Sequence, residues 1–244
     1  MIKSIQLENK SGYVLRGYVN LPNGASTIVV MLHGWTGNLT EHAGHFRNLS
    51  RRLEKENIAS LRFDYHGNGE SDGEFSDFVF EEAIDDAKRM IKYARSIQGI
   101  KRVILLGYSL GGAIASLVTN DEDNELLILW SPAGCMKEHA ALCFDRSKKL
   151  PNGNGFSAGF EFSHKFVDSI NKYDMYQNAK NYHNKVLILH GSSDTTVDPK
   201  YSAKYNDIFS DSDRYLIEGA GHGYNEYEQR EKLYKLTINF IKNN

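Results

Sequence analysis

The pentapeptide Gly-x-Ser-x-Gly occurs twice in the chain, at residues 107–111 and at residues 155–159. A pattern made of such common residues is weak evidence by itself, so the sequence around each copy must decide what it does. At most one of the two serines, Ser109 and Ser157, can be a nucleophile. The setting of these serines therefore constrains the fold more than any other feature.

The first copy lies between a short apolar run and a stretch of small apolar residues. Residues 103–106 are typical of a buried strand, and residues 113–118 are typical of a buried helix. A serine in the sharp turn between them has a strained backbone, and glycines are needed beside it because a Cβ would collide with neighbouring elements. The free N–H groups of the helix N-terminus favour developing negative charge. We therefore predict that Ser109 is a nucleophile.

The second copy follows Pro-Asn-Gly-Asn at residues 151–154, a run of turn formers with no strand before it. We interpret this copy as a loop and do not expect Ser157 to be catalytic.

The composition is that of an ordinary soluble domain. The chain has 244 residues, of which 41% are hydrophobic and 25% are charged, and one α/β domain of this size can bury a full core. A net charge of -2 without a basic cluster gives no electrostatic case for binding nucleic acid or a membrane. No secretory signal or membrane-spanning stretch is visible, so we expect a cytoplasmic protein. Cys135 and Cys143 lie in one irregular region and are expected to be free thiols.

The order of apolar patterns predicts an α/β fold. Residues 2–8 and 13–21 alternate apolar with polar and predict an N-terminal antiparallel hairpin. Strands then alternate with helices, which predicts a mostly parallel central sheet with helices on both faces. We predict strands at residues 27–32, 58–64, 103–108, 126–130, 186–190 and 214–217, and helices at 41–56, 80–96, after 199 and at 226–241.

The regular pattern breaks between about residues 133 and 184. This part is rich in Pro, Gly, Asn and scattered aromatic residues, and only residues 163–173 have a helical pattern. It is too long for a plain connection, so we predict a small inserted cap over a functional site within a single domain, residues 1–244.

A serine nucleophile needs a general base, and nine histidines compete for that role. His222 lies in a glycine loop after a predicted strand, where an imidazole can reach the strand ends. We predict that His222 is the base. Four others lie on polar stretches and are expected to be solvated: His42, His45, His164 and His183.

The base needs an acid that orients it, and residues 191–199 offer two aspartates. Asp194 follows the predicted strand directly, whereas Asp198 precedes Pro199, where a helix N-cap explains it without catalysis. We favour Asp194 and keep Asp198 as the alternative. The resulting chain order of Ser109, Asp194 and His222 is the order of α/β-hydrolases.

The loop after the strand at residues 27–32 is expected to supply half of an oxyanion hole. The predicted donors are the backbone N–H of Trp35 in this loop and that of Leu110, the residue after the nucleophile. The Trp35 ring can also pack under the cap. His33 is expected to brace the loop by hydrogen bonding. No metal or organic cofactor is required by this chemistry.

Five motifs together resemble the α/β-hydrolase superfamily across essentially the whole chain. They are His33-Gly34-Trp35-Thr36-Gly37, the block from Asp64 to Gly73, Gly107-Tyr108-Ser109-Leu110-Gly111-Gly112, His190-Gly191 with Asp194, and Gly221-His222. Within that superfamily the HGWTGN loop at residues 33–38 and the SDGEF stretch at residues 71–75 look like those of the small bacterial cinnamoyl or feruloyl esterases, which hydrolyse hydroxycinnamate esters and carry a small inserted cap. The resemblance implies an α/β-hydrolase fold and a carboxylic ester hydrolase.

We therefore expect hydrolysis of hydroxycinnamoyl or other small acyl esters through an acyl-enzyme intermediate. A monoacylglycerol lipase, a thioesterase, a peptidase or an acyltransferase would use the same triad, and a non-catalytic hydrolase-like binding protein is a distant alternative. The expected partner is a small ester molecule, and a homodimer is left open. Seven aromatic residues of the insertion could line an acyl pocket or form the core of the cap: Phe144, Phe156, Phe160, Phe162, Phe166, Tyr173 and Tyr176.

Overall fold

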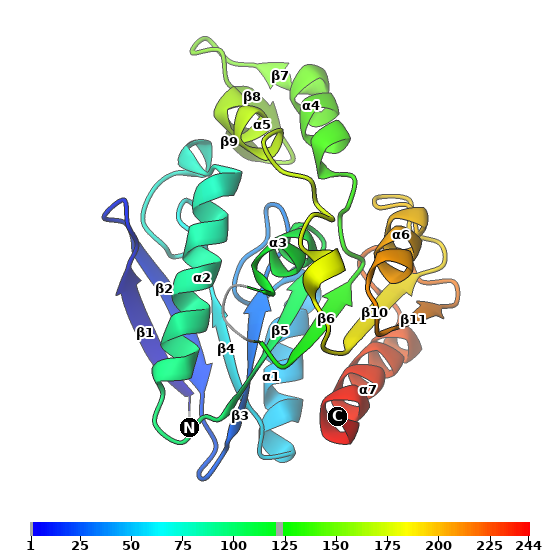
Figure 1. Cartoon of the computed structure of the whole chain (residues 1–244). Helices are drawn as coiled ribbons and strands as arrows, with labels where there is room; N and C mark the ends of the chain where they lie inside the picture. Colours follow the sequence, from blue (N-terminus) through cyan, green and yellow to red (C-terminus); the bar gives the residue numbers. More distant parts are fainter. Residues whose placement is uncertain (1, 121–123) are drawn as a thin grey trace.

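The computed structural model describes residues 2–120 and 124–244. Its centre is an eight-stranded sheet in the order β1-β2-β4-β3-β5-β6-β10-β11 (Figure 1). Strands β1 (Ile2–Glu8) and β2 (Val14–Asn20) form an antiparallel hairpin, and β2 pairs antiparallel with β4 (Ala59–Phe63). The remaining neighbours pair in parallel, and they are β3 (Thr27–Leu32), β5 (Arg102–Tyr108), β6 (Leu126–Trp130), β10 (Val186–Gly191) and β11 (Ser212–Ile217). The α/β-hydrolase fold with its N-terminal hairpin is therefore confirmed.

Helices cover both faces of the sheet because the central strands are apolar on both sides. Alternate residues of β3, β5 and β6 pack into two separate cores. One core includes α2 (Phe80–Ser96), α3 (Leu110–Val118) and α6 (Lys200–Ile208), and the other includes α1 (His45–Lys55) and α7 (Tyr227–Asn243). Nine residues of α3 are all buried, which explains why this helix is built from small and apolar side chains.

The predicted helix at residues 41–56 begins four residues later than expected. A short 3-10 turn, η1 (His42–Gly44), precedes α1, and Glu41, Ala43 and Gly44 all have positive φ angles. A helix cannot continue through residues in the left-handed region. This correction matters because residues 41–44 form a turn before α1 instead of a regular helix, and His45 becomes the first residue of that helix.

The segment between β6 and β10 projects from the end of the main sheet in Figure 1, and we call residues 133–184 the cap segment. Only one helix was expected there, α5 (His164–Ile170), but the segment also contains the longer helix α4 (Met136–Arg146). The apolar stripe of α4 is thin because Met136, Ala140 and Phe144 are its buried residues. The cysteines accordingly flank or lie in a helix, so their assignment to an irregular region was wrong. Both are free thiols, Cys135 buried and Cys143 exposed.

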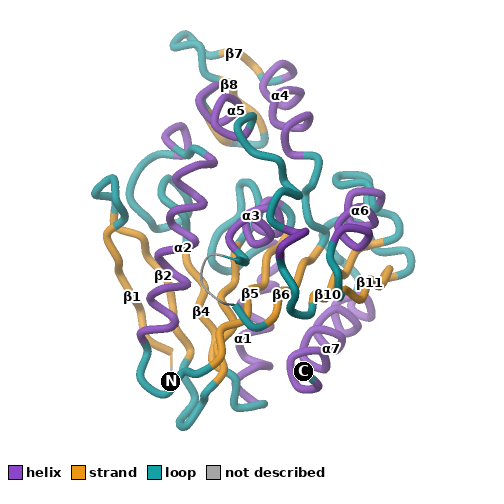
Figure 2. Tube along the Cα trace, viewed as in Figure 1, coloured by secondary structure: helices purple, strands orange, loops and turns teal. Residues whose placement is uncertain are grey.

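The second pentapeptide is also not a plain loop. Strands β7 (Lys148–Lys149), β8 (Gly155–Ser157) and β9 (Phe160–Phe162) form a small antiparallel sheet, and Ala158 and Gly159 make the turn between the last two. Figure 2 shows β7 and β8 beside α4 and α5, at a distance from the main sheet. The 3-10 turns η2 (Phe75–Asp77) and η3 (Ala179–Asn181) complete the described elements. None of the helices in residues 2–120 and 124–244 is both long and apolar enough to span a bilayer.

Candidate active site

Ser109 occupies the sharp turn between β5 and α3. Its φ angle is 56° and its ψ angle is −117°, which is a strained conformation for a residue with a side chain. A Cβ on Gly107 would overlap the carbonyl oxygen of Gly111, and a Cβ on Gly111 would overlap that of Leu32. Glycine is therefore required on both sides of the serine. The turn leaves Ser109 half-buried at the N-terminus of α3, as the first pentapeptide predicts.

His222 and Asp194, the predicted base and acid, are joined by a hydrogen bond. The Nδ1 atom of His222 lies 2.6 Å from Oδ2 of Asp194, and the Asp194 side chain is fully buried. A second histidine, His190, places Nε2 3.1 Å from the same oxygen. The other oxygen accepts the amides of Thr196 and Val197, each at 2.9 Å.

These contacts determine the charge of Asp194. Burial by itself would raise the pKa of its carboxyl, but the hydrogen bonds from His190 and His222 outweigh burial and hold this pKa below its usual range. Asp194 is therefore ionised, and its Oδ2 fixes the His222 tautomer with hydrogen on Nδ1 and a free lone pair on Nε2.

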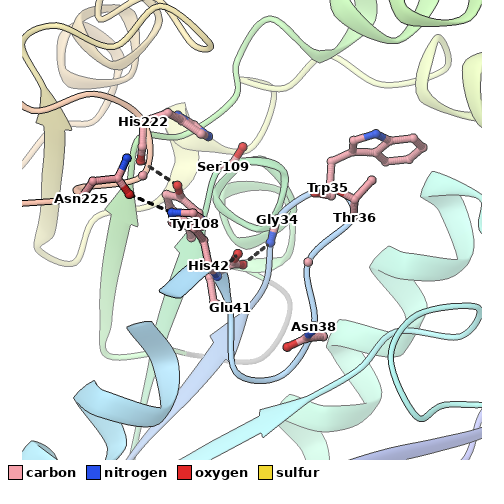
Figure 3. Close-up of a pocket in the computed structure, with 12 residues that line it drawn as sticks. Gly34, Trp35, Thr36, Asn38, Glu41, His42, Tyr108, Ser109, His222 and Asn225 are labelled. Carbon is pink, nitrogen blue, oxygen red and sulfur yellow. Dashed lines mark hydrogen bonds between the residues drawn. The ribbon is translucent and has the colours of Figure 1, made fainter. Parts of the chain in front are cut away.

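Ser109 and His222 border the same cavity, which has a volume of about 410 Å³. Figure 3 shows His222 on one side of Ser109 and Trp35 on the other. The lining residues are Gly34, Trp35, Thr36, Gly37, Asn38, Glu41, His42, Tyr108, Ser109, His222, Gly223 and Asn225. The structure thus brings the predicted nucleophile and base to one space, while Asp194 lies behind the base.

The two predicted oxyanion donors flank Ser109. Leu110 is the first residue of α3, and Trp35 follows Gly34, whose position for a Cβ is 3.2 Å from Cβ of Ser109. The amide of Gly34 donates to Glu41 at 2.7 Å, whereas the structure gives the Trp35 and Leu110 amides no partner within residues 2–120 and 124–244. Both amides are thus available to a ligand.

The Trp35 ring packs against four phenylalanines instead of filling the cavity. Its centroid is 4.2 Å from that of Phe166 and 5.6 Å from that of Phe162, both in the cap segment. Phe75 and Phe78, before α2, contact it at 4.7 and 5.8 Å. None of the seven aromatic residues of the insertion borders the cavity, and Phe156 and Phe160 are exposed.

Three other sequence expectations can be compared with the structure. His33 is buried and its Nδ1 lies 2.9 Å from the carbonyl oxygen of Gly34, as expected for a residue that braces the loop. Asp198 is exposed and was expected at a helix N-cap, but the N-cap of α6 is Pro199; Asp198 lies one residue earlier and accepts the Lys200 amide at 2.9 Å. His45 was expected to be solvated, and this was wrong. It is 1% exposed and bonds to Gly223 and Tyr234.

The sequence interpretation missed residues 41–45 because it assigned them to a regular helix. The Glu41 carboxylate is buried and accepts the amides of Gly34 and His42, and burial raises its pKa. His42 Nε2 lies 2.9 Å from Oδ1 of Asn225 at the rim of the cavity. The available signal was the density of polar residues directly after a glycine loop at a strand end. In the described part of the chain, His, Cys, Asp and Glu side chains do not gather in any group of three or more that could hold a metal ion.

Comparison with known proteins identifies relatives of this chain. An uncharacterized protein, YfhR, of Salmonella typhimurium is 35% identical over 117 residues, which are 45% of this chain and 38% of that protein. The YfhR protein of Salmonella typhi is 26% identical over 98% of this chain and 81% of its own length. The chain thus spans well under half of the first relative and most of the second.

Among solved structures, Est1E from Butyrivibrio proteoclasticus with bound ferulic acid has a TM-score of 0.85, with 22% identity over 98% of each chain. That likeness concerns the fold. The model of the family described as serine aminopeptidase, S33, matches residues 24–152, which include β3, the loop with Trp35 and the Ser109 turn. Because the match covers more than half of its residues, the chain belongs to this family of serine hydrolases with the α/β-hydrolase fold.

Proposed function

We propose that the chain is a carboxylic ester hydrolase in which Ser109 is the nucleophile, His222 the general base and Asp194 the acid that orients the base. The observation that carries the proposal is the 2.6 Å hydrogen bond from His222 to Asp194, with His222 and Ser109 bordering one cavity. Nucleophile, base and orienting acid in this arrangement are the requirements of acyl transfer.

In the proposed reaction His222 Nε2 takes the Ser109 proton while the Ser109 oxygen attacks the ester carbonyl. The amides of Trp35 and Leu110 stabilise the oxyanion, and each is worth about 3 kcal/mol in the transition state. His222 then protonates the leaving alcohol, and an acyl-Ser109 intermediate remains. Water, deprotonated by the same Nε2, attacks this acyl group and releases the acid and the free serine.

For the substrate we propose a hydroxycinnamoyl ester of the feruloyl type or another small acyl ester. Two observations support this choice. The cavity of about 410 Å³ is of a size that suits small ligands. The fold is similar to that of Est1E, which was solved with ferulic acid bound. We propose further that the cap segment forms part of the single hydrolase domain and selects the acyl group through its contact with Trp35.

A second candidate function is an aminopeptidase, because that activity appears in the description of the matching family. An amide would pass through the same acyl-enzyme with an amine as the leaving group, so the residues of the site do not separate the two.

The test is a comparison of kcat/KM for methyl ferulate, a short p-nitrophenyl ester, a monoacylglycerol and an amino acid p-nitroanilide, together with labelling by a fluorophosphonate probe. We expect labelling and the highest kcat/KM on methyl ferulate or the short ester. A preference for long acyl chains would indicate a lipase, and a preference for the anilide an aminopeptidase. Absence of both turnover and labelling would leave only a non-catalytic binding protein.

A further inference from the structure

The loop that carries His222 is held at two consecutive carbonyl groups by side chains from elsewhere in the chain. The hydroxyl of Tyr108 donates to the carbonyl oxygen of His222 at 2.6 Å, and Nε2 of His45 lies 2.9 Å from the carbonyl oxygen of Gly223. Tyr108 directly precedes Ser109, so it ties the base loop to the nucleophile turn. His45 is not adjacent in sequence to Ser109 or to His222. Its contact with Gly223 joins two residues that are 178 positions apart.

The surroundings of His45 fix which of its nitrogens carries hydrogen. A carbonyl oxygen can only accept, so the contact with Gly223 requires hydrogen on Nε2. Nδ1 must then be an acceptor, and the hydroxyl of Tyr234 lies 2.8 Å from it. Both ring nitrogens are therefore satisfied by a single neutral tautomer. Burial lowers the pKa of His45 to about 4, so the neutral ring persists at neutral pH.

The ring of His45 also packs against aromatic side chains. Its centroid lies 6.4 Å from that of Tyr108, 6.2 Å from Trp130 and 6.2 Å from Tyr224 in edge-on contacts. Packing of this kind allows few alternative orientations, so the Nε2–H group points in a fixed direction. His45 thus combines a fixed donor, a fixed tautomer and a partner in the peptide adjoining the proposed base.

We propose that His45 is a positioning residue that holds the Gly223 carbonyl, and through it keeps the His222 imidazole between Asp194 and Ser109. The proposal rests on the proposed function of His222 as the base. The physical reason is that Asp194 restrains only Nδ1 of the imidazole. The main chain at residues 222–223 determines the position of the His222 Cα atom, from which the side chain extends. A displacement of the base by about 1 Å can cost on the order of 100-fold in rate.

A matched pair of amides separates the contact with Gly223 from the contact with Tyr234. In His45→Gln the terminal amide can replace Nε2 and still donate to Gly223, whereas the shorter side chain of His45→Asn places its amide near the Nδ1 position and falls short of Gly223. On a p-nitrophenyl ester we expect His45→Asn to lower kcat by about 10- to 100-fold with KM within about 3-fold, and His45→Gln to retain kcat within about 3-fold of wild type. The rate of labelling by a fluorophosphonate probe should follow kcat.

Thr237→Val is the control for a purely structural effect. Thr237 is fully buried in α7, and its hydroxyl oxygen accepts a 3.0 Å hydrogen bond from Nε1 of Trp130, a neighbour of His45. Within residues 2–120 and 124–244 the structure gives no hydrogen bond between Thr237 and residues 222–223. The Tm of the Thr237→Val variant should fall while its kcat stays within about 2-fold of wild type. Loss of a buried hydrogen bond lowers stability, but it does not displace His222.

The proposal is overturned if His45→Asn retains wild-type kcat, or if both amide variants lose kcat to the same extent. It is equally overturned if Thr237→Val, at a matched fall in Tm, loses as much kcat as His45→Asn. A wild-type chain that neither hydrolyses esters nor reacts with the probe would instead overturn the proposed function. That outcome is distinguishable because the wild type is measured beside every variant.

Discussion

Two copies of the same five-residue pattern fold differently in this chain. At residues 107–111 the serine itself has the positive φ angle, 56°, between a buried strand and a buried helix. At residues 155–159 the serine ends a short strand, and the positive φ angles belong to Ala158 (52°) and Gly159 (87°), as in a two-residue hairpin turn. The pattern specifies only that glycine stands at two positions. The neighbouring elements determine whether a glycine is needed because a Cβ would collide or because the backbone has a positive φ angle.

The largest expected difference between the two copies is in activity. Ser109→Ala should lower kcat by roughly 10⁵-fold or more, because loss of a triad serine has costs of that order, while Ser157→Ala should stay near wild type. Ester turnover and fluorophosphonate labelling measure both variants. If Ser157→Ala also abolished turnover in a folded protein, the assignment of the two copies would be wrong.

The proposed acid, Asp194, gives the next largest expected effect. Asp194→Asn should lower kcat by about 10⁴-fold, because an amide no longer fixes the His222 tautomer. Asp198→Asn is the matched control, since Asp198 is exposed and an asparagine can still cap the Lys200 amide. Steady-state kinetics and circular dichroism of both variants decide the point. A larger loss of kcat in Asp198→Asn than in Asp194→Asn would identify Asp198, the alternative from the sequence, as the acid.

Substitution of a glycine in each copy should change the stability of the protein by different amounts. A Cβ on Gly111 would overlap the Leu32 carbonyl oxygen, whereas a Cβ on Gly159 would meet nothing within 4 Å. Gly111→Ala should therefore lower the free energy of unfolding by about 3 kcal/mol or more, or prevent folding. Gly159→Ala should cost about 1 kcal/mol, because its φ angle of 87° is unfavourable for alanine. Urea unfolding measures both, and equal costs would contradict the steric explanation.

The smallest predicted effect concerns pH, and it compares His33, which is buried near the first copy, with His164, which is exposed in the cap segment. Burial lowers the pKa of His33 in the folded chain to about 4, below the value of 6.5 in an unfolded one. A lowered histidine pKa means that stability is present above pH 6.5 and is lost as the pH falls toward 4. The contribution of His33 is on the order of 2 to 3 kcal/mol between pH 7.5 and 4.5.

Urea midpoints at these two pH values test the histidine prediction. His33→Gln should reduce the loss of stability in acid, while His164→Gln should leave it unchanged, because His164 is exposed in the cap segment. An unchanged pH dependence in His33→Gln would show that His33 is not buried in its neutral form.

The main sheet was predictable because it depends on local patterns and chain order, and the same patterns place the predicted residues Ser109 and His222 on one cavity. The pairing of Asp194 with His222 follows from two loops at neighbouring strand ends, β10 and β11. The conformation of residues 41–44 was not predictable, because a 3-10 turn with positive φ angles replaces a helix that the apolar spacing favours. Helix α4 was missed for the opposite reason, since its few buried residues give a weak periodic signal.

The contact between Trp35 and the cap segment has a consequence for protein engineering. The indole lies against Phe162 and Phe166 of that segment, while its own peptide nitrogen is a proposed oxyanion donor. A chimera that transplants residues 133–184 from a relative would therefore disturb turnover as well as substrate preference. Redesign of this chain for a chosen substrate should exchange the Trp35 loop, Phe75, Phe78 and the cap segment together.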